Sequence, residues 1–500
     1  MQPGRERRLV TSALMLGMFL AALEGTAVAA AVPTAVGQLG GMERYSWVFS
    51  AYLLASTTTV PLYGKLADLF GRRRIYQVAV ALFLLGSGLS GAAPSFGWLI
   101  LFRALQGLGA GGVLPVATTI VGDIYNLKER ARIQGLFSGV WAMASLLGPL
   151  LGGLITVALS WRWIFYLNIP FGLASALLLE RYFPEEPARR RHAIDLLGTL
   201  ALTGSVTALL LALIDGGTWG FSDPRTEGLL AAAVAGLALF VWQERRAPEP
   251  MLPLDLFASP LIAVASVGNA LLGALLFALT AYVPMFGQGV LGGTAVDAGT
   301  LLSPVLVGWP ISSTLAGWIL LRTGYRPLAL GGGVLIVLGS VLLAFSGLAT
   351  PHLQIMTAMF VVGLGMGFTS MPYLLGVQNA VPWDRRGVAT GTVQFFRNIG
   401  GAVAVAALGA LHNASLVAHA GPTANANAAL DPTFRASLAP ATLAQLTTAL
   451  LAALQAVFVA IAALAVITLA VAFLFPRGTA ESHARSGLER QSSSPPAPVP

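Results

Sequence analysis

The chain contains no cysteine among its 500 residues. This absence excludes a disulfide framework, a thiol nucleophile and a thiolate metal site. Charge is also scarce, because Asp, Glu, Lys and Arg make up 10% of the chain, whereas a soluble domain carries about 25%. The five histidines show no ligand spacing, so we expect neither a metal nor a cofactor. No clustered acids or nucleophile–base pair is present, which argues against an enzyme.

Hydrophobic residues dominate the composition at 56%, which predicts an all-α protein with many membrane-spanning helices. The net charge of +8 does not indicate nucleic-acid binding, because the arginines gather in short loops between apolar segments. Residues 107–112 have the glycine spacing of a dinucleotide-binding fingerprint but not its structural context. They lie inside an apolar span with no strand before it, so close helix packing explains them better. There is no phosphate-binding loop, and ATP is not the expected energy source.

Fourteen apolar segments of about 20 residues follow one another along the chain. They lie near residues 9–33, 46–66, 75–94, 97–121, 134–158, 163–182, 195–214, 227–244, 259–288, 297–321, 327–348, 352–378, 388–411 and 446–475. Of the 29 Lys and Arg residues, 23 fall in alternate loops that include both tails. By the positive-inside rule, both termini are predicted to be cytoplasmic, which agrees with an even number of spans.

An internal repeat divides the predicted helices into two lobes. Gly64 and Gly317 lie 253 residues apart in similar hinge sequences, and Gly148 and Gly400 lie 252 apart. Six helices need fewer residues than this offset, and the surplus fits two additional helices. We therefore predict a six-helix lobe over 1–190, two linker helices over 191–250, a second six-helix lobe over 251–475 and a disordered tail over 476–500. The loop near 412–445 is predicted to hold a short helix outside.

Several motifs resemble the fourteen-helix drug:proton antiporter branch (EmrB/QacA type) of the major facilitator superfamily, over about residues 9–475. The residues that carry the resemblance are Gly64, Leu66, Asp68, Gly71, Arg72 and Arg73 in loop 2–3, Arg103, Gln106, Gly107 and Gly109 in the fourth helix, Gly148–Gly153 in the fifth, Trp161–Phe165 and Asn168–Pro170 in the sixth, and Asp195–Gly198 at the first extra helix. The resemblance implies the major facilitator fold and a proton-coupled efflux antiporter that works by alternating access.

Three charged residues inside predicted spans are candidates for proton coupling. Glu24 stands where the family usually has aspartate, near the bilayer centre, where desolvation favours the neutral form of a carboxyl group. Arg103 is a fixed charge that can pair with Glu24 or with helix carbonyls. Arg397 is predicted to contact the proton site, an anionic head group or backbone carbonyls. For each of the three, a purely structural role is the alternative.

The resemblance also implies a gate and an antiporter helix. Gly64, Asp68, Gly71, Arg72 and Arg73 form the predicted conformational gate, in which Asp68 meets the N-terminus of a helix in the other lobe. The alternative is a solvated, positively charged loop. The antiporter motif comprises Gly148, Pro149, Gly152 and Gly153, which would bend the helix, pack it against the second lobe and limit leakage; simple helix packing is its alternative.

The substrate is expected to bind between the lobes near the midplane. The candidate contacts are Tyr282, Met285, Phe286, Gln288, Trp141, Gln394 and Phe395. We predict a monomer in the bacterial cytoplasmic (inner) membrane whose partners are protons, a small lipophilic substrate and membrane lipids, without nucleic acid. Two alternatives stay open: an exporter of a lipid or lipid-like compound on the same scaffold, and a non-transporting membrane sensor, which would tolerate loss of Glu24.

Overall fold

The computed structural model describes residues 5–125, 127–184, 195–220, 222–248, 250–382, 385–421, 430 and 432–476. Its long helices are α1 (Arg5–Leu39), α2 (Trp47–Phe70), α3 (Arg72–Gly91), α4 (Phe96–Ile124), α5 (Leu127–Ala158), α6 (Arg162–Tyr182), α7 (Leu196–Trp219), α8 (Pro224–Glu244), α9 (Pro260–Met285), α10 (Ala295–Thr323), α11 (Tyr325–Ala344), α12 (His352–Ala380), α13 (Arg386–Ala420) and α15 (Pro440–Phe473). Shorter turns are η1 (Met42–Arg44), η2 (Leu254–Ala258), the π-helical η3 (Phe286–Val290) and α14 (Pro432–Ser437).

Each predicted apolar segment lies on one of these helices, and a short helix, α14, occurs in the loop near 412–445. The predicted tail lies outside the described residues from position 477 onward, as do residues 185–194 of the predicted linker region. Local sequence explains several helix ends. The side chain of Thr294 accepts a hydrogen bond from the Asp297 amide while Asp297 accepts from Thr294, a capping box that begins α10.

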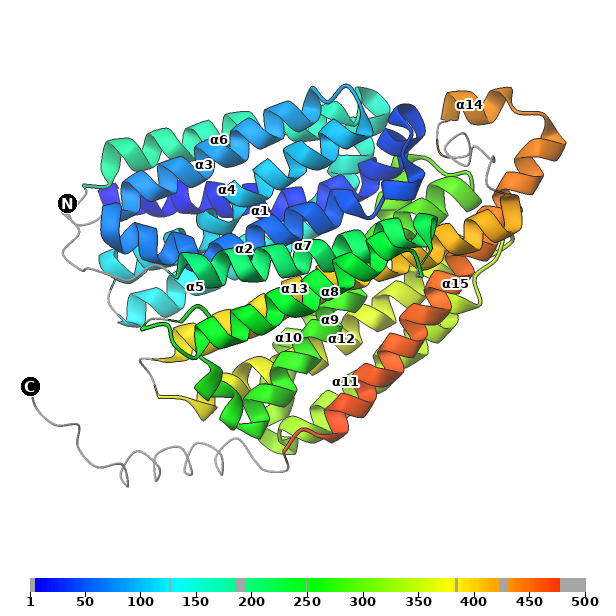
Figure 1. The fold of residues 1–500 in the computed structure, drawn as a ribbon. Coiled ribbons are helices and arrows are strands. Elements are labelled where there is room, and N and C mark those ends of the chain that lie inside the picture. Colours follow the sequence, from blue (N-terminus) through cyan, green and yellow to red (C-terminus); the bar gives the residue numbers. More distant parts are fainter. Residues whose placement is uncertain are drawn as a thin grey trace, which may run out of the picture.

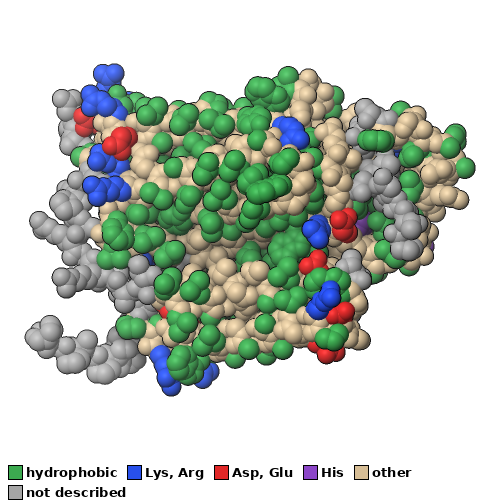
Figure 2. Space-filling view, turned by 45° about the horizontal axis from the view of Figure 1, so that its top comes forward, with side chains coloured by type: hydrophobic (Ala, Val, Ile, Leu, Met, Phe, Trp, Pro, Cys, Tyr) green, Lys and Arg blue, Asp and Glu red, His purple; other side chains and the backbone are tan. Residues whose placement is uncertain are grey.

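The prediction of many membrane-crossing helices is confirmed, but the number fourteen is not shown. Twelve helices in the described part of the chain are long and apolar enough to cross a membrane, so fourteen spans are not established. The two long helices outside this count are α2 and α5, of 24 and 32 residues. Polar residues 56–59 lower the hydropathy of α2, and Leu147–Ala158 of α5 counts as a shorter apolar stretch among the described residues. Apolar side chains cover the long flanks of the molecule and charged ones gather toward its ends (Figure 2).

The helices form two bundles that lie side by side, one from α1 to α6 and one from α9 to α15 (Figure 1). Helix α7 pairs with α8 and also packs against α2 and α13, so it lies along the junction of the bundles. We call the bundles the N-lobe and the C-lobe. Between them, α5 packs against α10 and α2 against α13.

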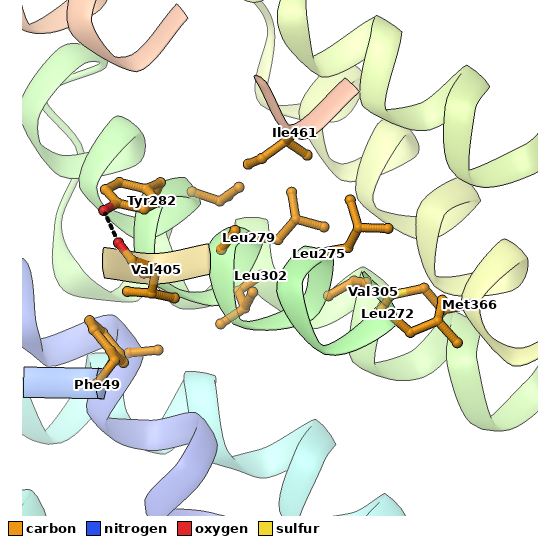
Figure 3. Close-up of a cluster of buried hydrophobic side chains, with 14 of the residues drawn as sticks. Phe49, Leu272, Leu275, Leu279, Tyr282, Leu302, Val305, Met366, Val405 and Ile461 are labelled. Atoms are coloured by element: carbon orange, nitrogen blue, oxygen red, sulfur yellow. Dashed lines mark hydrogen bonds between the residues drawn. The ribbon is translucent and has the colours of Figure 1, made fainter. Parts of the chain in front are cut away.

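The hydrogen bonds described between the lobes gather at the end of α1 that is remote from the N-terminus. Gln288 accepts from the Thr34 hydroxyl at 2.7 Å and donates to the Ala30 carbonyl at 2.8 Å. Tyr45 donates to the Ala281 carbonyl at 2.5 Å. An apolar cluster continues this contact, with Phe49 of the N-lobe beside Val405 and Tyr282 of the C-lobe (Figure 3). The lobes are therefore joined firmly at this end.

Candidate functional site

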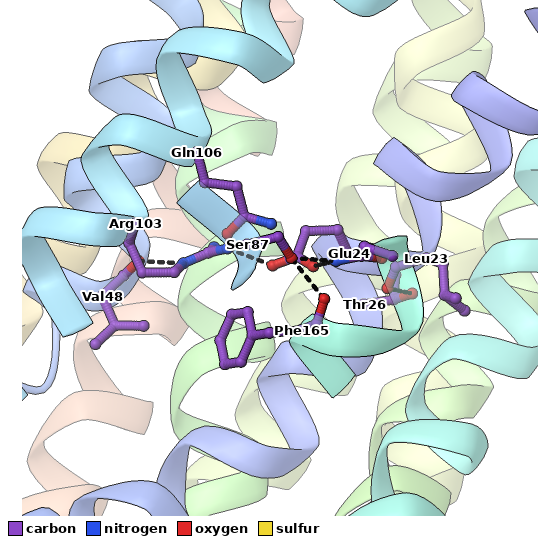
Figure 4. A network of polar contacts seen from close by, with 9 residues as sticks. Leu23, Glu24, Thr26, Val48, Ser87, Arg103, Gln106 and Phe165 are labelled. Atoms are coloured by element: carbon purple, nitrogen blue, oxygen red, sulfur yellow. Dashed lines mark hydrogen bonds and ion pairs between the residues drawn. The ribbon is translucent and has the colours of Figure 1, made fainter. Parts of the chain in front are cut away.

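A buried ion pair lies inside the N-lobe. Glu24 on α1 is 1% exposed and Arg103 on α4 is 2% exposed. The Nη1 atom of Arg103 donates to Oε1 of Glu24 (Figure 4). Such a pair is retained only when further hydrogen bonds satisfy both groups, because each charge has left water.

Further hydrogen bonds join the pair to residues on α2, α4 and α6. Asn168 on α6 donates to Oε2 of Glu24 at 2.5 Å and to the Ser87 hydroxyl at 2.9 Å. Arg103 donates to Gln106 at 2.8 Å and to the Val48 carbonyl at 3.3 Å. These contacts satisfy both carboxylate oxygens and hold the guanidinium in one orientation.

Aromatic and glycine residues shape the walls around this pair. The Arg103 guanidinium lies 4.1 Å from the centroid of the Tyr52 ring, which favours the cation. A Cβ on Gly86 would meet the backbone of Gln106, and one on Gly107 would meet the Tyr52 carbonyl. Glycine at both positions lets α4 approach α2 and α3 closely, which brings Arg103 within reach of α1.

Arg397, the third coupling candidate, lies apart from this network. Its guanidinium carbon lies 5.6 Å from the centroid of the Trp309 ring on α10. Its Nε atom is enclosed and has no hydrogen-bond partner. The structure therefore brings Glu24 and Arg103 together but does not bring Arg397 to them.

The predicted gate lies at the junction of α2 and α3. Gly71 has φ 97°, a conformation that glycine adopts without strain, and it separates the two helices. Asp68 accepts from Arg72 at 3.4 Å, and Arg72 also pairs with Asp123 on α4. Arg73 donates to the Phe183 carbonyl at 3.4 Å. These contacts of the gate residues lie within the N-lobe, and the gating role stays a prediction. Gly64 faces open space.

The residues of the antiporter motif lie at two helix contacts. Side chains at Gly148 and Gly152 would collide with Thr26 and Ala27 on α1. A side chain at Gly153 would collide with Ala295 at the start of α10, in the C-lobe. Pro149 lies inside α5, with its carbonyl against Gly299 of α10. The motif thus lies between α1 and the C-lobe, while its effect on leakage remains a prediction.

Four of the substrate candidates lie in the closed end between the lobes. Tyr282 donates to the Val405 carbonyl at 3.0 Å, and Phe286 packs on Phe458 with ring centroids 5.5 Å apart. Met285 is fully buried, and Gln288 joins α1 as described above. These side chains serve packing and lobe contact in this conformation, and substrate contact stays a prediction.

The other three candidates lie elsewhere. Trp141 on α5 is 38% exposed. Gln394 donates to Asn398 at 3.0 Å along α13, and Phe395 belongs to the apolar cluster that includes residues of α7. The structure does not bring these three together with Tyr282 into one pocket.

Sequence reasoning gave no site role to four residues of the buried network: Ser87, Asn168, Gln106 and Tyr52. Gln106 and Asn168 belong to the motifs that carry the family resemblance, but the motifs gave them no role in the site. A polar residue inside an apolar span was the available signal, because such a residue needs a partner. The sequence alone could not show that Asn168 links Glu24 on α1 to Ser87 on α3.

Comparison with known proteins agrees with this architecture. The family model described as "Major Facilitator Superfamily" matches residues 14–405. The chain belongs to this superfamily. Its members are transporters rather than enzymes, so this protein is a membrane transporter.

Among relatives of this superfamily member, "Multidrug transporter protein MdtP" of Bacillus subtilis is 36% identical over 410 residues, which cover 82% of this chain and 76% of the relative. "Multidrug resistance protein 3" of the same organism is 34% identical over 404 residues, 80% and 79% of the two chains. "Efflux pump FUS6" of Gibberella fujikuroi is 34% identical over 437 residues, 83% and 76% of the two chains. This protein is therefore related to multidrug transporters and efflux pumps.

Solved structures share the fold. A bacterial homolog of the human lysosomal transporter Spinster, crystallised in an inward-facing and unoccupied conformation, superposes with a TM-score of 0.69 at 17% identity and covers 98% of both chains. The nucleoside transporter NupG superposes with a TM-score of 0.60 at 14% identity, over 94% of this chain and 100% of NupG. At these identities the likeness is one of fold alone.

Proposed function

We propose that this protein is a proton-coupled exporter of small lipophilic compounds that works by alternating access. The observation that carries the proposal is the buried Glu24–Arg103 pair, a carboxylate and a fixed cation inside the N-lobe. The kinship with multidrug transporters and efflux pumps supports the substrate class. A carboxyl in such a place has a functional role more often than a structural one, because its burial is costly.

The proton chemistry follows from the partners of Glu24. As a carboxylate it is stabilised by Arg103 and Asn168. When it takes up a proton, Arg103 loses its counter-ion but keeps Gln106, the Val48 carbonyl and the Tyr52 ring. The cation is thus partly compensated in both states, which lets Glu24 exchange a proton at moderate cost. Loading of a proton from outside and its release inside would drive export.

The lobe contacts support an inward-facing conformation. If both termini are cytoplasmic, as the positive-inside rule predicts, the hydrogen bonds through Tyr45 and Gln288 close the outer end. In this conformation Asp68 accepts a hydrogen bond from Arg72 of its own lobe. We propose that Asp68 reaches a helix N-terminus of the C-lobe only when the inner side closes.

The finer assignments belong to the same proposal. Helices α2 and α5 pack into the N-lobe bundle beside spanning helices, so we propose fourteen spans, with α7 and α8 as the two additional ones. This arrangement fits the EmrB/QacA branch, and a monomer in a bacterial cytoplasmic membrane. The motifs around Gly148 and Asp68 support the assignment.

The proposal is tested with purified protein in liposomes that contain a pH-sensitive dye. Lipophilic compounds such as ethidium and rhodamine are added under an imposed proton gradient, and we expect at least one to change proton flux. Glu24→Gln should abolish this flux while the protein still inserts. Glu227→Gln, a change at an exposed carboxyl on α8, is the matched control and should keep it.

Wild-type coupling in Glu24→Gln would remove Glu24 from the mechanism. If the protein transports none of the soluble compounds but moves a labelled phospholipid between leaflets, it is a lipid exporter instead. Transport of neither kind, together with an unchanged response of cells to loss of Glu24, would favour the sensor.

A further inference from the structure

The C-lobe holds an arginine, Arg397, whose charge has no counter-ion among the residues that the structure describes. Arg397 lies on α13, is half-buried, and takes part in no hydrogen bond or ion pair of its side chain within the part of the chain that the structure describes. Its Nε is enclosed without a partner, whereas the two terminal nitrogens are not enclosed in this way. A guanidinium carries five N–H donors and stays protonated. An unsatisfied donor at this depth is costly, and native structures seldom keep one without a function.

Neighbouring residues hold this arginine in place. Gly273 on α9 touches the Arg397 backbone, and any side chain there would collide with it. This close approach fixes the start of the side chain, which then reaches Trp309 on α10. The Trp309 indole donates to the Ser370 hydroxyl on α12 at 3.1 Å, which orients the ring. Four helices of the C-lobe therefore contribute to one arrangement.

The arrangement has the features of a receptor for an acidic group. The cation–π contact with Trp309 at 5.6 Å stabilises the cation without a hydrogen bond, so the N–H donors of the guanidinium stay available. A carboxylate or phosphate accepts from such a fork through two parallel hydrogen bonds. The indole adds an apolar wall beside it for the body of the ligand.

We propose that Arg397 and Trp309 form a subsite that binds an oxyanion, a carboxylate or a phosphate, on an otherwise lipophilic molecule. The subsite rests on the proposed transport function and names part of its substrate range. It is separate from the Glu24–Arg103 pair, in which Arg103 already has its partners. An acidic substrate or the head group of an anionic lipid would supply the counter-ion that Arg397 lacks.

Binding is measured without a proton gradient, so that failure of coupling and failure of this subsite are distinguishable. The purified protein in phosphatidylcholine nanodiscs is titrated with dansyl-undecanoate and with its uncharged amide, and dansyl fluorescence is followed. We expect the wild type to bind the carboxylate about ten-fold more tightly or better, as one charge-assisted bidentate contact allows. Arg397→Gln should bind the two probes equally, and Arg397→Lys should restore part of the preference because a point charge lacks the fork.

A matched control is available in Arg246, which lies 4.1 Å from the Trp242 ring at an exposed position near the end of α8. Arg246→Gln removes an arginine–tryptophan stack of the same kind and should keep the preference. Trp309→Leu should lower the affinity for both probes. This variant tests the subsite if Arg397→Gln fails to fold. Equal affinity for both probes in the wild type, or an unchanged preference in Arg397→Gln, would overturn the proposal.

A further experiment with an anionic lipid decides whether the oxyanion comes from a lipid head group or from a soluble compound. Nanodiscs that contain phosphatidylglycerol are compared with phosphatidylcholine alone. If phosphatidylglycerol competes with dansyl-undecanoate in the wild type but not in Arg397→Gln, lipid head groups occupy the subsite. If it does not compete, the subsite serves soluble acidic compounds. In both results the carboxylate preference supports the subsite.

Discussion

The two lobes each bury an arginine, but they treat it differently. In the N-lobe, Arg103 is enclosed with a carboxylate, an amide, a carbonyl and an aromatic ring as partners. In the C-lobe, Arg397 has the Trp309 ring beside it and pairs with no acid among the described residues. An ion pair that the structure describes in this half of the chain, Asp255 with Arg385 at 2.7 Å, lies at the surface instead. The proposed proton exchange uses the arginine that has a carboxylate beside it, and the proposed oxyanion subsite uses the arginine that has none among the described residues.

The hinges between α2 and α3 and between α10 and α11 share their backbone geometry but differ in the side chain that precedes the glycine. Gly71 has φ 97° between α2 and α3, and Gly324 has φ 83° between α10 and α11. Asp68 precedes the first glycine by three residues, and Leu321 holds that place before the second. The turn therefore needs glycine in both lobes, but only the N-lobe hinge carries an acid.

The largest difference is expected when each buried arginine is replaced by methionine. Arg103→Met leaves Glu24 without its counter-ion, and breaking a buried pair costs about 3–5 kcal/mol of folding free energy. Arg397→Met removes a charge that has no ionic partner, so stability should be unchanged or increased. Thermal and denaturant unfolding in detergent measure both. An equal loss in the two variants would show that Arg397 has a structural partner after all.

A second expected effect concerns the hinges, where the lobes should behave alike. Gly71→Ala and Gly324→Ala each place a side chain at positive φ, which costs about 1–2 kcal/mol. We expect similar drops in unfolding temperature for both. Gly64→Ala is the control, because a side chain there meets open space. A hinge variant as stable as the control would mean that its turn relaxes to another conformation.

A smaller effect is expected from the acid that only the N-lobe hinge carries. Asp68→Asn removes a charge that favours the closed inner side, and one charge near a helix N-terminus contributes about 0.3–1 kcal/mol. This corresponds to a two- to five-fold shift toward the inward-open state, at about 1.4 kcal/mol per factor of ten. Single cysteines can report it by labelling from each side, since the chain has none of its own. Unchanged labelling on both faces would contradict the gate.

The sequence was enough to predict the order of helices and to single out Glu24 and Arg103 as charges within apolar helices, because apolar runs and isolated charges are local signals. It could not show that Asn168 reaches both Glu24 and Ser87, since three helices far apart in sequence determine those contacts. Nor could it separate the Arg397 site from the proton site. The substrate candidates from Tyr282 to Gln288 were chosen from a helix position, and whether they face a cavity depends on the conformation.

The smallest effect is expected at the exposed ion pair of the C-lobe. Arg385 donates to Asp255 and holds the pKa of that carboxyl below its usual range. Asp255 and Arg385 are 59% and 40% exposed, and such pairs contribute about 1 kcal/mol at most.

Because the folded-state pKa of Asp255 is lowered, its contribution is present above the unfolded value near about 3.9 and is lost as the pH falls through the folded value. Asp255→Asn should therefore lower the unfolding temperature slightly at pH 7 and have no effect once both states are protonated. High salt should shrink the difference at pH 7, since solvent ions screen exposed charges. Unfolding curves of wild type and variant over pH and salt measure this. A large effect that resists salt would place the pair among the buried charges and remove the contrast between the lobes.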